Sequence, residues 1–201
     1  MKLYFSPTSP FVRKVRLIAA SLNMTDEIQI IPTDVYAKND DYKQINPLIK
    51  IPALETREGQ ILTNSPFICQ YLISLKPGSG LWPQGNDLWR ALNLQSIADG
   101  GMEAAVLRRY ESLRTADKFD SSFDQKQRQK ILNALEFLER NLAELSTIQM
   151  GIAESSALCF VDYLHLRFSK ENLGNQFPRL FGWAEKWNST PWVQKTAPPK
   201  A

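Results

Sequence analysis

Ser9 is the first residue whose type and position could do chemistry. It stands where a short apolar segment, Leu3–Phe5, gives way to a helical pattern that starts at Pro10. A serine followed by a proline is a common pair at the start of a helix, so one interpretation is a plain helix cap. The other interpretation gives the hydroxyl a role in a functional site. Ser6 and Thr8 are neighbouring hydroxyls that could take the same role.

Other reactive side chains are few. Cys69 and Cys159 lie in apolar runs, are far apart in the sequence and form no C-x-x-C motif. We therefore expect two buried thiols in a reducing cytoplasm. The only histidine is His165, and no cysteine or carboxylate cluster accompanies it. This argues against zinc and against a Ser–His pair, so we expect no metal site.

Three polar or proline positions precede expected elements. Ile51–Pro52 stands before a short strand, where proline is common because it cannot donate a ladder hydrogen bond. Asn64 and Ser65 stand before a helical run, where they could be a plain cap. The same helix start is also a place where anions bind. Lys50 could simply be a solvated lysine.

The first part of the chain alternates strand and helix patterns in the order β-α-β-α-β-β-α. A parallel strand pair joined by a crossover helix and followed by a hairpin is the thioredoxin arrangement. We predict strands at 2–6, 28–31, 53–56 and 60–62 and helices at 10–22, 38–45 and 65–75.

The second part of the chain is expected to be all helical. Residues 78–86 are rich in proline and glycine and are predicted to link a domain at 1–77 to a helical domain at 87–201. Apolar residues recur there at helical spacing, for example at Ile131, Leu135 and Leu138. A last long helix is predicted at about 178–188.

Composition excludes several classes of protein. Of the 201 residues 43% are hydrophobic, which is enough for a core and makes disorder improbable. A net charge of +3 does not indicate a nucleic-acid or membrane-surface partner. There is no apolar run of about 18 residues and no signal-peptide pattern, so we expect a cytoplasmic protein.

Three stretches point to the same family: SPFVRKVR at 9–16, NPLIKIPAL at 46–54 and LTNSPFICQYL at 62–72. Together they resemble the N-terminal domain of the cytosolic glutathione transferases. The helical second half is similar to the C-terminal domain of that family, and residues 98–106 (ADGGMEAAV) resemble a bacterial, serine-type branch of it. The most specific motif is N-P-x-x-K-I-P-A-L.

The resemblance implies a binding site for glutathione. It implies a cis Ile51–Pro52 bond that presents the N–H and C=O of Ile51 to the cysteinyl backbone of the tripeptide. It places the γ-glutamyl group at Asn64 and Ser65, the glycyl carboxylate at Lys50, and Asp99 near the glutathione of a partner subunit. Most members carry Glu, Gln or Asp where this chain has Asn64, which predicts weaker affinity.

The resemblance also implies a role for Ser9. A hydroxyl that donates to the glutathione sulfur favours the thiolate and would lower the thiol pKa from about 8.5 by roughly one to two units. Serine in place of a cysteine makes disulfide exchange improbable. The electrophile pocket would be lined by an apolar and aromatic set that could alternatively be plain core: Phe11, Met102, Val106, Arg109 and Tyr110.

The function implied is conjugation of the glutathione thiolate to small hydrophobic electrophiles by a homodimeric glutathione transferase. Two alternatives remain open at this point. One is a non-catalytic member of the family that binds a ligand or a protein. The other is a glutathione-dependent peroxidase or reductase.

Three structural expectations complete the sequence analysis. Arg13, Lys14 and Arg16 are expected on the outer face of the first helix. Gly100 and Gly101 cost helix stability and suggest close approach of another backbone or a ligand. The capping box that many members have near residue 155 is expected to be missing, because Cys159 stands where an aspartate might.

Overall fold

The structure is a computed structural model that describes residues 1–37 and 40–199. Its first half is a four-stranded sheet in the order β2-β1-β3-β4. The strands are β1 (Lys2–Phe5), β2 (Gln29–Pro32), β3 (Ala53–Glu55) and β4 (Ile61–Thr63). β1 and β2 are parallel, and the other two pairs are antiparallel. The predicted thioredoxin-like arrangement is therefore confirmed.

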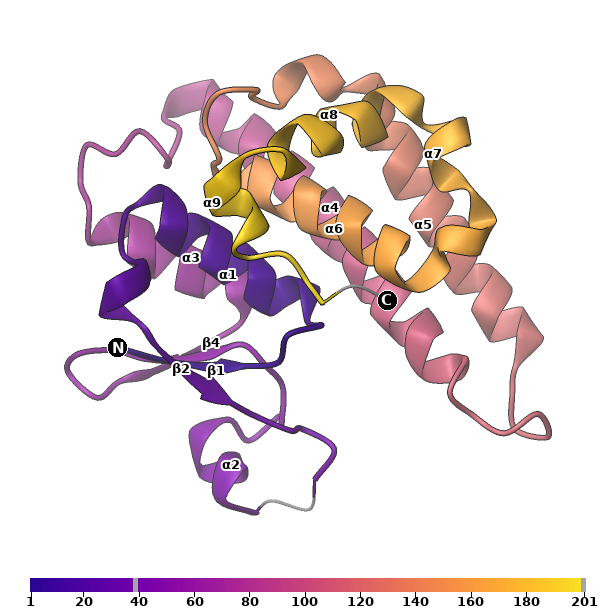
Figure 1. Ribbon diagram of the computed structural model, residues 1–201, viewed down its shortest axis with the longest axis horizontal. Helices are drawn as coiled ribbons and strands as arrows, with labels where there is room; N and C mark the ends of the chain where they lie inside the picture. Colours follow the sequence, from indigo (N-terminus) through magenta and orange to yellow (C-terminus); the bar gives the residue numbers. More distant parts are fainter. Residues whose placement is uncertain (38–39, 200–201) are drawn as a thin grey trace.

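Helices cover both faces of this sheet. Figure 1 shows α1 (Pro10–Ser21) and α3 (Ser65–Ser74) on one side and the short α2 (Asp40–Ile45) on the other. The side of α1 and α3 holds the core of this half, where Val15, Ile18 and other apolar residues are buried. The helix predicted at 38–45 includes residues 38 and 39, which lie outside the described residues.

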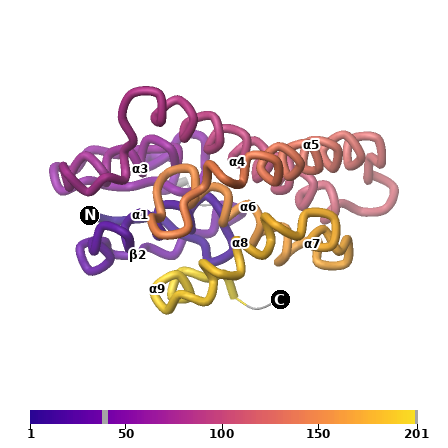
Figure 2. The backbone as a smooth tube through the Cα atoms, turned by 90° about the horizontal axis from the view of Figure 1, so that it is seen from above, coloured from indigo at the N-terminus to yellow at the C-terminus, as the bar shows by residue number. Residues whose placement is uncertain are grey.

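The second half is helical, as expected. None of the helices among the described residues has the length and apolar character that a membrane span requires. Figure 2 shows α1 lying next to α6, and this contact joins the two halves. The helices of this half are α4 (Gly85–Glu111), α5 (Ser121–Arg140), α6 (Ile152–Phe168), α7 (Leu173–Gln176), α8 (Pro178–Asn188) and α9 (Pro191–Gln194), with 3-10 turns η2 (Leu142–Glu144) and η3 (Ser169–Glu171). A further 3-10 turn, η1 (Thr25–Glu27), lies between α1 and β2 in the first half.

The outward position expected for the cations of α1 is wrong for Arg13. This side chain is only 5% exposed, because α6 and the C-terminal segment cover its side of the helix. Its guanidinium pairs with Asp162 of α6 and donates to Asn188 Oδ1 at 3.2 Å. Arg16 is half-buried and donates to the backbone carbonyls of Lys195 and Thr196.

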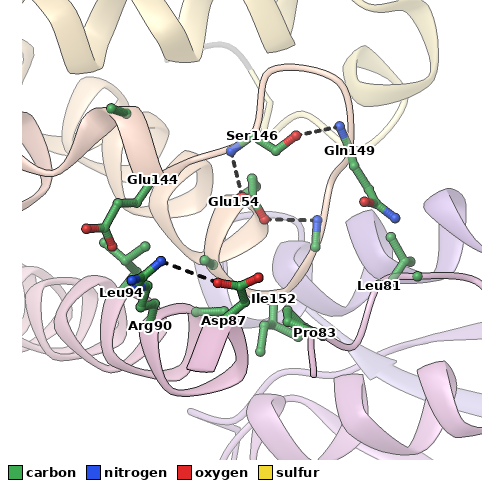
Figure 3. Close-up of a pocket in the computed structure, with 15 residues that line it drawn as sticks. Leu81, Pro83, Asp87, Arg90, Leu94, Glu144, Ser146, Gln149, Ile152 and Glu154 are labelled. Carbon is green, nitrogen blue, oxygen red and sulfur yellow. Dashed lines mark hydrogen bonds and ion pairs between the residues drawn. The ribbon is translucent and has the colours of Figure 1, made fainter. Parts of the chain in front are cut away.

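The start of α6 is capped by a carboxylate, that of Glu154. The expectation that the cap is missing, because Cys159 stands where an aspartate might, is therefore wrong. Glu154 Oε2 accepts the N–H of Gly151 at 3.1 Å, and Glu154 Oε1 accepts the N–H of Ser146 at 2.8 Å (Figure 3). Burial raises the pKa of Glu154, while the two backbone donors act to lower it. The acid stands five residues before Cys159 because α6 begins at Ile152.

The two adjacent glycines of α4 have different surroundings. A Cβ atom on Gly101 would lie 2.5 Å from the Phe160 ring, so the close approach at this point is by a side chain of α6. The sequence analysis expected another backbone or a ligand at this point, and that expectation is wrong for Gly101. A Cβ atom on Gly100 would meet nothing within 4 Å. Gly101 is thus the glycine that lets α4 and α6 pack closely.

These surroundings predict opposite effects for two alanine substitutions. Gly101→Ala should lower the free energy of unfolding by about 1–3 kcal/mol, because the added methyl forces α4 and α6 apart. Gly100→Ala should raise it by up to about 1 kcal/mol, because alanine is the better helix former. Urea unfolding of both variants measures the difference. Equal shifts in the two midpoints would contradict the packing described here.

Candidate functional site

A cleft of about 670 Å³ lies between α4 and the edge of the α/β half formed by the loop before β3 and the start of α3. Its wall brings together segments that are far apart in the sequence. Seven of the residues predicted for the site line it: Phe11, Lys50, Ile51, Pro52, Asn64, Ser65 and Asp99.

The loop before β3 is held by two side chains that donate to one carbonyl. Asn46 Nδ2 lies 2.6 Å from the carbonyl oxygen of Lys50, and the Tyr42 hydroxyl lies 2.8 Å from it. The Ile51–Pro52 peptide bond is cis. Within the described chain, the N–H and C=O of Ile51 make no hydrogen bond. Both groups are therefore available to pair with the backbone of a ligand.

The start of α3 presents polar groups that the helix itself does not use. Asn64 is the N-cap residue, with a φ of 70°, but its side chain makes no capping hydrogen bond. Ser65 is buried, and its hydroxyl has no partner among the described residues. Both line the cleft at the positive end of a ten-residue helix. This arrangement suits an anionic or zwitterionic ligand group.

Ser9 lies at the start of α1. It is the N-cap residue, and its Oγ accepts the N–H of Val12 at 3.3 Å. Its hydroxyl proton has no acceptor in the described part of the chain, so Ser9 can still donate a hydrogen bond. Ser9 does not line the main cleft; it lines a very small cavity with Tyr163 and Cys159, while Phe11, two residues further on, does line the cleft.

The two cysteines are unsuited to thiolate chemistry. Cys69 and Cys159 are free and fully buried, and burial raises the pKa of each thiol to about 12. Among the described residues, no group of three or more His, Cys, Asp or Glu could hold a metal ion.

Comparison with known proteins gives the family. The family model described as "Glutathione S-transferase, N-terminal domain" matches residues 3–80. The Escherichia coli K12 protein named "Uncharacterized GST-like protein YibF" is 32% identical over 205 residues, and the match covers 100% of both chains. The chain belongs to the glutathione transferase family.

Two crystal structures of a glutathione transferase family member from Pseudomonas fluorescens Pf-5 are similar to it throughout. One, with bound glutathione, is 35% identical, has a TM-score of 0.92 and is matched over 98% of each chain. The other, with bound S-(propanoic acid)-glutathione, is 34% identical, has a TM-score of 0.89 and is matched over 99% of this chain and 100% of that one.

Asp99, which the transferase family resemblance places near a partner's glutathione, has a partner within its own chain. Lys14 Nζ lies 2.8 Å and 2.7 Å from its two carboxylate oxygens. Lys14 is 0% exposed, so its expected position on the outer face of α1 is wrong, and Asp99 is 18% exposed on the cleft wall. The charge of Asp99 is therefore largely balanced before any ligand arrives.

The residues predicted for the electrophile pocket separate in the structure. Met102 is completely buried in the helical core, so its side chain does not reach a ligand in the cleft. Val106, Arg109 and Tyr110 do not line the cleft but lie further along α4. Phe11 is the member of this set that does line it.

Sequence reasoning missed several residues that shape the site. Asn46 belongs to the N-P-x-x-K-I-P-A-L motif, but the motif does not reveal that its side chain holds the carbonyl of Lys50. Nothing in the sequence pattern assigns the same role to Tyr42. Tyr36 and Tyr163 come from a loop and from α6 and lie near Tyr110 and Ser9 respectively. The helical spacing of Cys159 and Tyr163 puts them on one face, which was a usable signal.

A second cavity, of about 310 Å³, lies around the start of α6 and the start of α4 (Figure 3). It contains none of the predicted site residues. Three of its four charged residues already have partners within the chain: Glu154 accepts the two backbone N–H groups, and Arg90 lies 3.4 Å from Asp87. The family's cleft is therefore the better candidate for a functional site.

The buried ion pair predicts how α4 responds to substitution. Asp99→Asn should lower the free energy of unfolding by roughly 3–5 kcal/mol, because it leaves the buried ammonium of Lys14 without a counter-charge. The matched control is Glu103→Gln, since Glu103 lines the same cleft from α4 but is exposed and makes no ion pair with a described residue. It should change stability by no more than about 0.5 kcal/mol.

The double variant Lys14→Met/Asp99→Leu tests the cause of this loss. It removes both charges, so it should recover most of the stability that Asp99→Asn loses. Urea unfolding measures all three variants. A double variant as unstable as Asp99→Asn would show that the packing of α1, and not the unpaired charge, determines the loss.

Proposed function

We propose that this protein binds glutathione in the cleft and conjugates it, through its sulfur, to small hydrophobic electrophiles, as a glutathione S-transferase of the bacterial branch that uses serine. The observation that carries the proposal is the convergence, on one cleft, of an unpaired Ile51 backbone, an unused Asn64 amide and the start of α3. The relatives whose structures contain glutathione or its conjugate support the same ligand.

Each part of the tripeptide has a counterpart among these residues. The cysteinyl backbone would pair with the N–H and C=O of Ile51. The carboxylate of the γ-glutamyl group would bind at Ser65 and the start of α3. The side-chain oxygen of Asn64 would accept a hydrogen bond from the ammonium of the same group. Lys50 is exposed at the rim of the cleft and would meet the glycyl carboxylate. The remaining group, the sulfur, would then point toward the start of α1.

The chemical step needs a thiolate. The hydroxyl of Ser9 would donate to the sulfur, and the positive end of α1 acts in the same direction. The thiol proton passes to solvent. The sulfur then attacks an electrophilic carbon, a carbon–sulfur bond forms, and the leaving group departs with the electron pair of the bond that breaks. Ser9 therefore stabilises the nucleophile and is not itself the nucleophile.

Two other functions use the same cleft. A peroxidase or reductase role is disfavoured, because a serine stands at the start of α1 and both cysteines are buried with a pKa raised to about 12. A non-catalytic binding role is kept open by Asn64, which stands where most relatives have a longer or a charged side chain.

Titration calorimetry with glutathione, followed by a conjugation assay, separates these functions. We expect saturable binding, weaker than in relatives that carry a carboxylate at this position, and turnover with a chlorodinitrobenzene. Binding without turnover would favour the non-catalytic role. No heat of binding up to millimolar glutathione would refute glutathione binding altogether.

Replacing Ser9 tests the mechanism. Ser9→Ala should raise the pKa of bound glutathione by roughly one to two units, because a hydrogen bond to the charged form is lost. Turnover at pH 6.5 should fall by about 10-fold or more and should recover as the pH rises. Thiolate absorption followed against pH measures the pKa directly.

Controls separate this role from helix capping. Ser9→Thr keeps the hydroxyl and should keep the pKa, whereas Ser9→Ala also costs about 0.5–2 kcal/mol as a lost cap. Ser6→Ala and Thr8→Ala should leave the thiol pKa unchanged. A shift caused by either of these, with none for Ser9→Ala, would assign the sulfur contact to that hydroxyl instead.

The proposal extends to a homodimer in the cytoplasm. Phe67 of α3 and Trp89 of α4 are apolar side chains that are 62% and 69% exposed, and exposed apolar groups of this size favour an interface. Two free, buried cysteines suit a reducing compartment.

A further inference from the structure

Beyond the cleft, one face of α4 leads to a second group of residues. Asp99, Glu103, Val106 and Tyr110 follow one another at spacings of four, three and four, which places them on the same face of the helix. Asp99 and Glu103 line the cleft. Tyr110 stands seven residues beyond Glu103, or about 10 Å at 1.5 Å per residue. This is about the size of a small aromatic molecule.

The C-terminal end of α6 lies beside this end of α4. Gly101 packs against Phe160, and Arg108 lies 4.7 Å from the centre of the Phe168 ring, so the two helices run in the same direction. Figure 1 shows them next to each other. Tyr163 and Arg167, one turn apart on α6, therefore lie near the part of α4 that carries Arg109 and Tyr110.

Three tyrosines gather at this place. The rings of Tyr36 and Tyr110 meet edge to face, with centroids 6.0 Å apart, although the two side chains are 71% and 44% exposed. Tyr163 lines the small cavity next to Ser9. Burial raises the pKa of Tyr110 and of Tyr163. These hydroxyls therefore stay protonated at neutral pH and can donate hydrogen bonds.

Two arginines accompany the tyrosines and have no counter-charge. The Arg167 guanidinium lies 5.8 Å from the centre of the Tyr163 ring. Burial raises the pKa of Tyr163, and the charges of Arg167 and Arg109, together with a hydrogen bond from Arg167, act to lower it. Neither forms an ion pair with any carboxylate of the described residues. Arg109 makes a long hydrogen bond, of 3.4 Å, to the Ser112 hydroxyl, and Arg167 Nε is buried without a hydrogen-bond partner.

Arg108, the neighbour of Arg109, shows the contrast. It pairs with Asp124 and Glu171 and lies over Phe168, so its donors serve to hold helices together. Buried donors in proteins are almost always satisfied. Arg167 Nε is such a donor without a partner, and no carboxylate of the described residues balances the positive charges of Arg109 and Arg167. An acidic ligand group would supply both the acceptor and the counter-charge.

We propose that the electrophile of this enzyme is an aromatic molecule that carries a carboxylate or similar acidic group. Its ring would lie among Tyr36, Tyr110 and Tyr163, its acidic group on Arg109 and Arg167, and its reactive carbon toward the sulfur near Ser9. The inference rests on the proposed transferase function and narrows the substrate class from hydrophobic electrophiles in general to anionic ones.

The test compares two electrophiles that differ by one ring carboxylate, a chlorodinitrobenzene and the corresponding chlorodinitrobenzoate. In both, the sulfur replaces chloride, which leaves with the bonding pair. The wild-type protein should have the higher kcat/KM for the benzoate. The double variant Arg109→Gln/Arg167→Gln should lower kcat/KM for the benzoate by about 10-fold or more, because hydrogen bonds to a charged group are lost. It should change kcat/KM for the neutral substrate by less than about 3-fold.

The control is Arg140→Gln, which removes an exposed arginine from the last turn of α5. It should leave kcat/KM unchanged for both substrates. Equal losses for both substrates in the double variant would assign Arg109 and Arg167 to the stability of their helix ends and overturn the inference. A wild-type preference for the neutral substrate would overturn it as well, while leaving the transferase function standing.

A binding measurement decides the inference even if neither electrophile turns over, an outcome that would count against the transferase function alone. Calorimetry with the two finished conjugates, S-(dinitrophenyl)glutathione and its ring-carboxylate analogue, needs no catalysis. The carboxylate conjugate should bind more tightly to the wild-type protein, and the double variant should lose this difference. Equal affinity of the wild-type protein for both conjugates would refute the anion site.

Discussion

Two cations of α1, Arg13 and Lys14, are buried where the α/β half meets the helical half, and each has a carboxylate of the helical half as its counter-charge. Arg13 pairs with Asp162 of α6, and Lys14 pairs with Asp99 of α4. Buried charges tolerate little displacement, because losing the partner leaves an uncompensated ion. The two pairs therefore fix α1 against two helices at once.

The candidate site depends on this placement of α1. Ser9 caps the helix, Phe11 lines the cleft, and the partner of Lys14 forms part of the opposite wall. Because Lys14 pairs with Asp99, α4 is also held in position relative to the α/β half, which carries the loop around Ile51. A cleft built between two halves of a chain needs such a constraint, since neither half alone determines its width.

The sequence predicts the order of the elements and most of the residues that line the cleft around Ile51 and the start of α3, for a physical reason. The residues of that side come in short contiguous motifs, and each motif combines a turn or helix start with the groups that it exposes, as in Ile51–Pro52 and Asn64–Ser65. The faces of α1 were harder to assign. A helix covered by the sheet on one side and by α6 on another buries residues all round, and its periodicity does not tell a solvated lysine from a paired one.

The start of α6 shows the same limit on a smaller scale. Glu154 can be recognised as the capping acid only if the first residue of the helix is known. Helix ends are the least regular part of an apolar pattern, so the sequence does not reveal that residue. Gly101 is similar: its need for space is evident from the sequence, but the neighbour that uses the space, Phe160, is almost sixty positions away.

The electrophile side is the part that sequence reasoning could not assemble. Tyr36, Tyr110 and Tyr163 come from three distant segments. The rings of Tyr36 and Tyr110 meet edge to face, and Tyr163 belongs to α6, which runs beside α4 in the same direction. Parallel helices bring their C-terminal ends together, and each C-terminal end favours cations. Helix stability alone would allow Arg109 and Arg167 to be paired as Arg108 is, with Asp124 and Glu171. Neither arginine has such a partner among the described residues, and the proposed site for an acidic substrate rests on these two unbalanced charges.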